Sequence, residues 1–276
     1  PWDFIIPHSD GSGVISAVGE GVSSSRIGER VWIWNGQFRR AWGTGAQQVA
    51  LPSEQAVRLP DEVSLEVGAI LGIPGLTACY AVFGHGDVAG KTVLVQGGAG
   101  TVGILAVQLA KWGGARVIAT CGAQGAERAL AAGADAVLDY RASDLAAQIL
   151  AANAGNPVDL IVEVEFGTNI ATDAEVITEN GRIAAYGSAR EMSPNLPFLP
   201  LLFKAVTVEI ILVYLLTQEQ RQATISRLHR ALKAGALTFD IQKVYQISEA
   251  CAAHEAVEAG ARQGAVLIRT RENALS

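Results

Sequence analysis

Residues Lys91–Lys111 read KTVLVQGGAGTVGILAVQLAK, and this stretch decides the fold. Thr92–Val95 is a β-branched and aliphatic run of the kind that a buried parallel strand needs. Thr101–Trp112 places apolar residues at helical spacing, and glycines punctuate the chain between the two. The stretch is therefore predicted to form a strand, a tight turn and a helix.

The turn matches a dinucleotide-binding fingerprint. Gly98 permits a sharp turn, Gly100 removes the Cβ that would obstruct a pyrophosphate, and Gly103 lets the helix pack closely on the strand. Amide groups at the helix N-terminus would face the anion. A second strand at Ala115–Thr120 makes the G-x-G-x-x-G spacing specific. The candidate cofactor-binding residues of the turn are Gly98, Ala99, Gly100, Thr101, Val102 and Gly103.

Composition argues against several classes of protein. Half of the 276 residues are hydrophobic and only 17% are charged, which favours a folded chain with two lobes over disorder. The net charge of −6 gives no electrostatic footprint for nucleic acid or an anionic membrane. The longest apolar run, Val206–Leu216, is too short to span a membrane and contains Glu209. Three scattered cysteines fit a reducing compartment, so we expect a cytoplasmic protein.

The order of elements predicts an α/β protein. Residues 1–60 read as short strands, and a helical pattern follows from Leu65 that Pro74 should end or bend. Beyond the fingerprint, strands and helices alternate, which requires a doubly wound parallel sheet with helices on both faces. Its last strand is expected within Thr207–Tyr214. The predicted domains are a β domain over 1–74 and 236–276, and a nucleotide-binding domain over 75–235.

The end of the second strand bears on the choice of nucleotide. NAD-binding units place a carboxylate there to bind the ribose 2′-hydroxyl. Here the strand ends in Thr120 and Gly122, with no carboxylate before Glu127, which favours NADPH. Arg128, Arg141 and Tyr140 are the candidates for the 2′-phosphate and adenosine. Either arginine is equally consistent with an ordinary solvated side chain.

The following phrases occur in this order along the chain: PHSDGSGV, GERVW, LPDEVSLEVGAILGIPGLTA, TVLVQGGAGTVG, GARVIAT, GADAVLDYR, GRIAAYGS and AHEAVEAGARQGAVLI. Together they resemble a known family, the zinc-free quinone oxidoreductases. This family is the zeta-crystallin-like branch of the medium-chain dehydrogenases/reductases. The likeness covers nearly the whole chain from about Pro7 to Arg269, although the family begins further upstream and part of its substrate wall is expected to be missing here.

The resemblance implies a Rossmann domain and a barrel-like, GroES-like β domain that is incomplete at its front, with NADPH as cofactor. Thr77 matches the family's threonine near the nicotinamide, and Tyr140 matches the tyrosine of its N-Y-R stretch. Gly187 and Ser188 match the loop after the fifth strand. Members usually form homodimers by edge-to-edge pairing of the last Rossmann strand. The family's basic residue after the second strand falls near the uncharged Gly125, so Arg128 stands in for it.

No metal site is expected. Zinc-dependent members of the superfamily place a histidine where this chain has Ser9, and a cysteine ligand where it has Ile73, so a three-ligand site cannot be assembled. His8 is more typical of a capping or surface histidine. No nucleophile with an adjacent base stands out, and catalytic residues are left unassigned. Glu163 and Glu165 resemble a paired carboxylate that anchors a loop, with contact to the cofactor ribose as the alternative.

We therefore expect an NADPH-dependent, zinc-independent reductase that transfers hydride to quinones or other α,β-unsaturated carbonyls. Its partners would be a small-molecule acceptor and a second copy of the chain, with no nucleic acid and no membrane. Two alternatives remain open: an enoyl-thioester reductase on the same scaffold, and a non-catalytic, crystallin-like NADPH-binding protein. The sequence does not identify the physiological acceptor.

Overall fold

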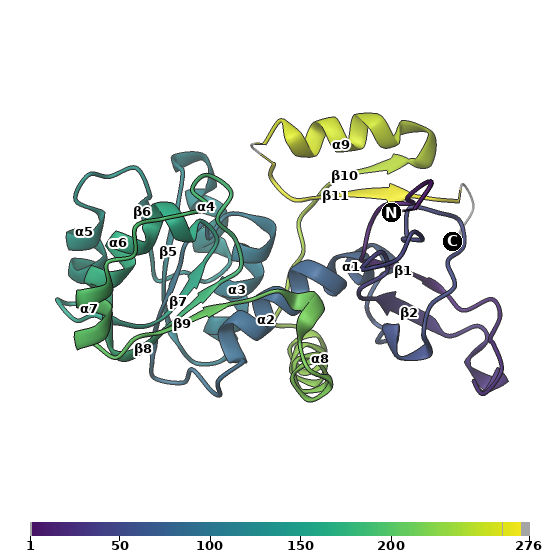
Figure 1. Ribbon diagram of the computed structural model, residues 1–276, viewed down its shortest axis with the longest axis horizontal. Helices are drawn as coiled ribbons and strands as arrows, with labels where there is room; N and C mark the ends of the chain where they lie inside the picture. Colours follow the sequence, from purple (N-terminus) through teal and green to yellow (C-terminus); the bar gives the residue numbers. More distant parts are fainter. Residues whose placement is uncertain (1, 261, 272–276) are drawn as a thin grey trace. The chain divides into compact units, whose positions relative to one another are not determined.

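The chain divides into two compact units. The computed structural model describes residues 2–260 and 262–271 (Figure 1). The first unit comprises Pro1–Leu76 and Phe239–Ser276, and the second comprises Thr77–Thr238. The chain passes from the first unit to the second between Leu76 and Thr77, inside a helix, and returns between Thr238 and Phe239 in a segment without regular structure.

The second unit is built on a parallel sheet. In the described residues this sheet has six strands in the order β6-β5-β4-β7-β8-β9, each parallel to its neighbours. The strand order reverses between β4 and β7, which is where open α/β sheets bind ligands. The strands are β4 (Thr92–Val95), β5 (Arg116–Cys121), β6 (Ala136–Asp139), β7 (Val158–Glu163), β8 (Ile177–Ala185) and β9 (Thr207–Ile210).

Helices cover both faces of this sheet (Figure 1). Leu94 and Ile161 pack with Ile149 of α5 and Ile170 of α6, whereas the alternate positions Val93 and Val95 are equally buried on the opposite face. Strands that are apolar on both faces are typical of a parallel sheet between helical layers. The helices are α2 (Leu76–Phe83), α3 (Thr101–Trp112), α4 (Ala126–Ala131), α5 (Leu145–Ala152), α6 (Phe166–Val176), α7 (Phe198–Phe203) and α8 (Gln218–Lys233).

The first unit contains two small sheets in its described residues. β1 (Gly11–Val14), β2 (Arg30–Ile33) and β3 (Ala56–Arg58) form an antiparallel sheet in that order. β10 (Ile241–Gln246) and β11 (Ala265–Arg269) are parallel, and α9 (Ala250–Glu258) runs beside them (Figure 1). The predicted α/β class, a doubly wound sheet with a smaller β-rich part, is confirmed.

Pro74 was expected to end or bend the helix, and the helical stretch does not end there. α1 (Leu65–Ile70) continues into a π-helical turn, Leu71–Gly75, and then directly into α2. The wider turn accommodates a proline, which has no N–H to donate. The stretch Leu65–Phe83 is long and apolar enough to cross a membrane, but 67% of its most apolar window is buried in the protein. A buried core helix meets the same criteria, so this stretch is weak evidence for a membrane span.

The last strand is shorter than predicted. β9 ends at Ile210, and Val213–Leu215 forms a 3₁₀ turn instead of continuing the strand. A further helix, α7, precedes β9 where no element was predicted. Ile211 is buried, whereas Ile210 is 70% exposed. The outward-facing residue of this edge is therefore Ile210.

Candidate functional site

The glycine turn after β4 is shaped by close contacts. Gly97 has φ +69°, so the left-handed residue of the turn is Gly97 and not Gly98 as the motif suggested. A Cβ on Gly98 would lie 2.6 Å from Ala119 Cβ, and one on Gly103 would lie 2.2 Å from the Gly97 carbonyl oxygen. Both positions must therefore be glycine for the turn to fit against β5 and α3.

Gly100 is different because the space beside it is open. A Cβ there would meet only the Gly97 carbonyl oxygen, at 3.4 Å. Gly100 is also the N-cap of α3, and no side chain caps this helix end. The first amides of a helix lack intrahelical partners and attract anions. This open, uncapped end at the strand-order reversal fits a phosphate group, and Ala99, Thr101 and Val102 lie in the same turn.

A cationic cluster lies beside the end of β5. The Arg141 guanidinium carbon is 4.7 Å from the centre of the Tyr140 ring, and that of Arg190 is 6.0 Å from it. Gly122 adjoins the same groups, since a Cβ on it would be 3.7 Å from Tyr140 Cε1 and from an Arg141 guanidinium nitrogen. All three side chains are exposed. We call Tyr140, Arg141 and Arg190 the arginine–tyrosine cluster.

Arg190 was missed in the sequence because its neighbours come from distant segments. It lies in the loop after β8, which Glu165 anchors by accepting a hydrogen bond (2.7 Å) from the Arg190 amide. Ser188 fixes the same loop, because its Oγ accepts from Gly167 N at 2.8 Å. A Cβ on Gly187 would lie 2.4 Å from the Val164 carbonyl oxygen. The predicted residues Gly187 and Ser188 therefore shape the loop that carries Arg190.

Arg128 lies against the glycine turn. Its guanidinium donates to the Ala99 carbonyl oxygen at 3.2 Å. Thr120 is fully buried, and its hydroxyl donates to Gln96 Oε1 at 2.5 Å, so its side chain lies under the turn and not on its surface. Thr77, at the start of α2, is also buried. No hydrogen bond in the described residues joins Thr77 to the glycine turn.

The carboxylates after β7 anchor loops. Glu163 is fully buried and accepts hydrogen bonds from the Glu165 amide and from Asn169 Nδ2, the latter at 3.0 Å. A further buried carboxyl group, that of Asp173 on α6, lies near it: burial and the charge of Glu163 raise the pKa of Asp173. The loop-anchoring interpretation of Glu163 and Glu165 therefore agrees with these contacts, and Asp173 is an additional carboxyl group that the sequence did not indicate.

His8 and Asp10 flank Ser9, the position at which zinc-dependent members of the superfamily have a histidine ligand. His8 Nε2 lies 2.9 Å from His254 Nε2, and burial together with His254 lowers the pKa of His8. Asp10 is packed against the π-helical turn, where burial raises the pKa of its carboxyl to about 6. Over residues 2–260 and 262–271, no group of three or more His, Cys, Asp and Glu side chains is arranged to hold a metal ion.

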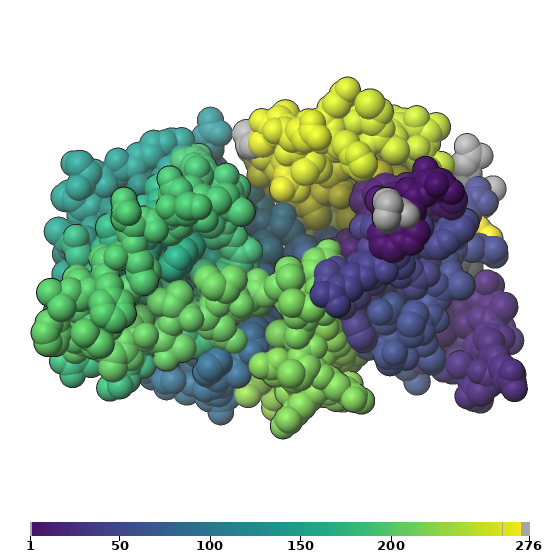
Figure 2. Space-filling model, viewed as in Figure 1, coloured from purple at the N-terminus to yellow at the C-terminus, as the bar shows by residue number. Residues whose placement is uncertain are grey.

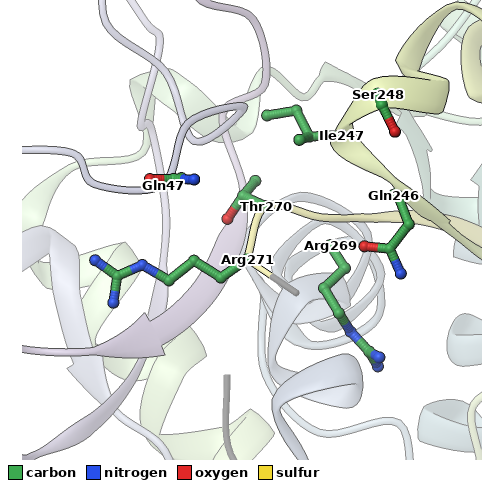
Figure 3. Close-up of a pocket in the computed structure, with 7 residues that line it drawn as sticks. All are labelled: Gln47, Gln246, Ile247, Ser248, Arg269, Thr270 and Arg271. Carbon is green, nitrogen blue, oxygen red and sulfur yellow. The ribbon is translucent and has the colours of Figure 1, made fainter. Parts of the chain in front are cut away.

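A separate cavity of about 290 Å³ lies in the first unit. It contains the side chains of two arginines, and Arg269 is paired with Glu66 at 3.1 Å. In Figure 3 the two guanidinium groups point away from each other and do not converge on one point. The cavity is lined by Gln47, Gln246, Ile247, Ser248, Arg269, Thr270 and Arg271.

The parallel sheet, the glycine turn and the uncapped helix define a dinucleotide-binding oxidoreductase fold. Residues 101–230 match a family model described as zinc-binding dehydrogenase. The chain is 31% identical to quinone oxidoreductase of Sus scrofa over 254 residues, which are 90% of this chain and 74% of that protein. It therefore belongs to the quinone oxidoreductase family of the medium-chain dehydrogenases/reductases.

Solved structures agree with this placement. Quinone oxidoreductase of Pseudomonas syringae is 28% identical, with a TM-score of 0.82 over 94% of this chain and 80% of that one. The Escherichia coli quinone oxidoreductase, determined as a complex with NADPH, is 27% identical, with a TM-score of 0.82 over 94% of this chain and 81% of that one.

Proposed function

We propose that this protein is an NADPH-dependent reductase that acts without a metal on quinones or other α,β-unsaturated carbonyls. The observation that carries the proposal is the open, uncapped helix end at Gly100 with the arginine–tyrosine cluster beside it. The first feature fits a pyrophosphate, and the second fits the 2′-phosphate that distinguishes NADPH from NADH. The similarity to the NADPH complex of the Escherichia coli enzyme supports the same choice.

Each candidate residue has a proposed task. Gly98–Gly103 would hold the pyrophosphate, with Arg128 next to the turn, and Gly122, Tyr140, Arg141 and Arg190 would bind the adenosine phosphate end. Thr77 remains a proposed contact of the nicotinamide. When bound, the dihydronicotinamide supplies a hydride to the electron-poor acceptor. The protein then contributes binding and orientation, and no protein nucleophile is required.

Two assays test the substrate class. We expect NADPH to be oxidised with 1,4-benzoquinone and much more slowly with crotonyl-CoA, measured by the loss of absorbance of NADPH. Faster turnover of crotonyl-CoA would identify an enoyl-thioester reductase instead. Tight NADPH binding without turnover of either would identify a non-catalytic binding protein. Activity that disappears with a zinc chelator and returns with zinc would contradict the metal-free mechanism.

We also propose that two copies pair along β9, the outermost strand of the parallel sheet. The chain around α7 and β9, green in Figure 2, forms part of the visible surface of the second unit. Ile210 is 70% exposed, and Leu212 and Leu215 are exposed beside it. An unpaired edge strand with apolar side chains is a template for association.

The first unit would be the substrate-binding β domain. A cytoplasmic location is proposed because Cys79, Cys121 and Cys251 are free thiols.

Ile210→Lys is expected to convert the dimer to a monomer. Lysine at this position would place like charges along the paired edges and remove apolar contact. The measurement is the mass in solution by light scattering after size-exclusion chromatography. Leu130→Lys, at an exposed leucine of α4, is the matched control and should leave the mass unchanged. An unchanged dimer in Ile210→Lys would show that β9 is not the interface.

A further inference from the structure

Four polar side chains are buried together beneath the glycine turn. Glu163 ends β7, Asp173 lies on α6, Gln96 follows β4 and Thr120 belongs to β5. None of the four is more than 1% exposed. Buried polar groups are costly unless every donor meets an acceptor, so their hydrogen bonds constrain one another.

The donors around the two carboxyl groups show which one is ionised. Glu163 accepts a hydrogen bond from the Glu165 amide. It also accepts from Asn169 Nδ2, which lies 3.0 Å from its Oε1 and 3.2 Å from its Oε2. Asp173 Oδ1 accepts from Gln96 Nε2 at 3.0 Å, whereas Asp173 Oδ2 is buried and meets no N–H or hydroxyl donor. Both carboxyl groups are fully buried, and the charge of Glu163 raises the pKa of Asp173, so the two cannot both be ionised and the pair keeps one proton. The converging donors favour a charged Glu163, which leaves the proton on Asp173.

Electrostatics point the same way. Burial raises the pKa of both carboxyl groups, and the charge of Glu163 raises the pKa of Asp173 further. Among the residues that the structure describes, Glu165 and Tyr186 also interact with Glu163: the charge of Glu165 raises the pKa of Glu163, and burial and Glu163 raise the pKa of Tyr186. Neither supplies a positive charge that would stabilise two carboxylates.

A chain of hydrogen bonds connects this pair to the glycine turn. Gln96 gives its Nε2 hydrogen to Asp173 and accepts the Thr120 hydroxyl hydrogen at its Oε1. Thr120 also accepts two hydrogen bonds from the glycine turn. Gly97 N donates to the Thr120 hydroxyl oxygen at 3.4 Å, and Gly98 N donates to the Thr120 carbonyl oxygen at 2.8 Å. The orientation of the Gln96 amide is thus set by a proton donor on one side and an acceptor on the other.

We infer that Asp173, protonated and donating to a charged Glu163, is a positioning residue that holds the Gly97–Gly98 turn in shape for the dinucleotide through Gln96 and Thr120. The inference rests on the proposed NADPH binding for its functional part. Its structural part, the location of the proton, rests on the donor pattern and on the burial of both carboxyl groups. Asp173 and Glu163 lie beneath the turn and touch no substrate in this assignment.

Amide substitutions separate the two carboxyl groups. In Asp173→Asn, the side-chain NH₂ can donate to Glu163 while the oxygen still accepts from Gln96, so every bond has a replacement. In Glu163→Gln, an NH₂ group replaces one carboxylate oxygen of Glu163. The Glu165 amide and Asn169 Nδ2 donate to that carboxylate, so a donor loses its acceptor. We expect Asp173→Asn to change the NADPH Kd by less than about threefold and Glu163→Gln to raise it about tenfold or more, measured by fluorescence titration.

The pH dependence of stability shows whether the folded carboxyl pair keeps a proton. Asp173 keeps its proton in the folded state above 3.8, its ordinary pKa, whereas the unfolded chain releases it. The folded state then binds more protons, so this group makes the free energy of unfolding fall as pH rises from about 4 towards the raised pKa of Asp173. Asp173→Asn has no such proton. The wild type should therefore lose stability relative to Asp173→Asn as pH rises, measured by urea unfolding.

Each result decides between assignments. Tolerance of Glu163→Gln with disruption by Asp173→Asn would put the proton on Glu163 and overturn the inference, as would a pH-independent stability difference. Equal NADPH affinity in both variants would overturn the positioning role. If Glu163→Gln does not fold, Thr120→Val tests the connection instead, with an expected rise of about tenfold in Kd and an unchanged Kd as the contrary result. Wild-type protein that binds no NADPH would refute the proposed function but leave the urea test of the proton valid.

Discussion

Gly100→Ala is expected to weaken NADPH binding at least about tenfold while the protein stays folded. The new Cβ meets only the Gly97 carbonyl oxygen at 3.4 Å, and the N-cap backbone (φ −76°, ψ 168°) is open to alanine. The methyl group instead fills the space proposed for the pyrophosphate. Forcing an extra carbon into a packed contact costs about 1–3 kcal/mol, and 1.4 kcal/mol is tenfold in Kd. Isothermal titration calorimetry with NADPH measures the loss.

Two comparisons make this result specific. Gly103→Ala places its Cβ 2.2 Å from the Gly97 carbonyl oxygen, so it should lower the Tm as well as the affinity. Gly19→Ala, at an exposed glycine with no neighbouring atoms within 4 Å, should change neither. NADPH binding of wild-type strength in Gly100→Ala would mean that the phosphates do not lie on this turn.

Replacing both arginines of the arginine–tyrosine cluster should remove the preference for NADPH. Arg141 and Arg190 both stand over Tyr140 beside the end of β5. A hydrogen bond to a charged group contributes about 1.5–3 kcal/mol, so the double variant Arg141→Ala/Arg190→Ala should raise the NADPH Kd at least about tenfold. The NADH Kd should change less than about threefold, because NADH has no 2′-phosphate.

The control is an arginine at the other end of the same strand. Arg116 opens β5 and donates to the Ala152 carbonyl oxygen at 2.7 Å. Arg116→Ala should leave the ratio of the two Kd values unchanged, even if stability drops slightly. An equal loss of affinity for both coenzymes in the double variant would assign the arginines to the shared part of the dinucleotide, not to its 2′-phosphate.

The parts of the fold that depend on local sequence could be predicted. The run before Gly97 and the helical spacing after Gly100 define strand, turn and helix within one segment, so β4 and α3 were placed correctly. Pro74 was expected to end or bend the helix because a proline inside a helix is a local stop signal, whereas the π-helical turn that contains it depends on packing. Gly72, for example, lies so close to β2 that a Cβ would be 2.0 Å from the Ile33 carbonyl oxygen.

The candidate site was predictable only where a local sequence pattern indicates its residues. The glycine turn and Tyr140 follow directly from the sequence pattern. Arg190 reaches Tyr140 only because Glu165 holds the loop after β8, which no spacing rule indicates. Asp173 was overlooked because an aspartate in a helix usually faces solvent, and its burial against Glu163 depends on how α6 packs on β7.

The Glu209 side chain restricts the register in which β9 can pair with β8. Glu209 is held by Arg182 of β8 and by the Tyr80 hydroxyl at 2.9 Å, while its neighbour Ile210 faces outward. Alternate residues of a strand face opposite sides of a sheet. A shift of β9 by one residue would therefore place Ile210, in place of the Glu209 carboxylate, next to Arg182. The Arg182 guanidinium would then be left without its ion-pair partner. The ion pair between Arg182 and Glu209 therefore fixes the register of β9 against β8. Any second copy that pairs along β9 then meets the same order of side chains.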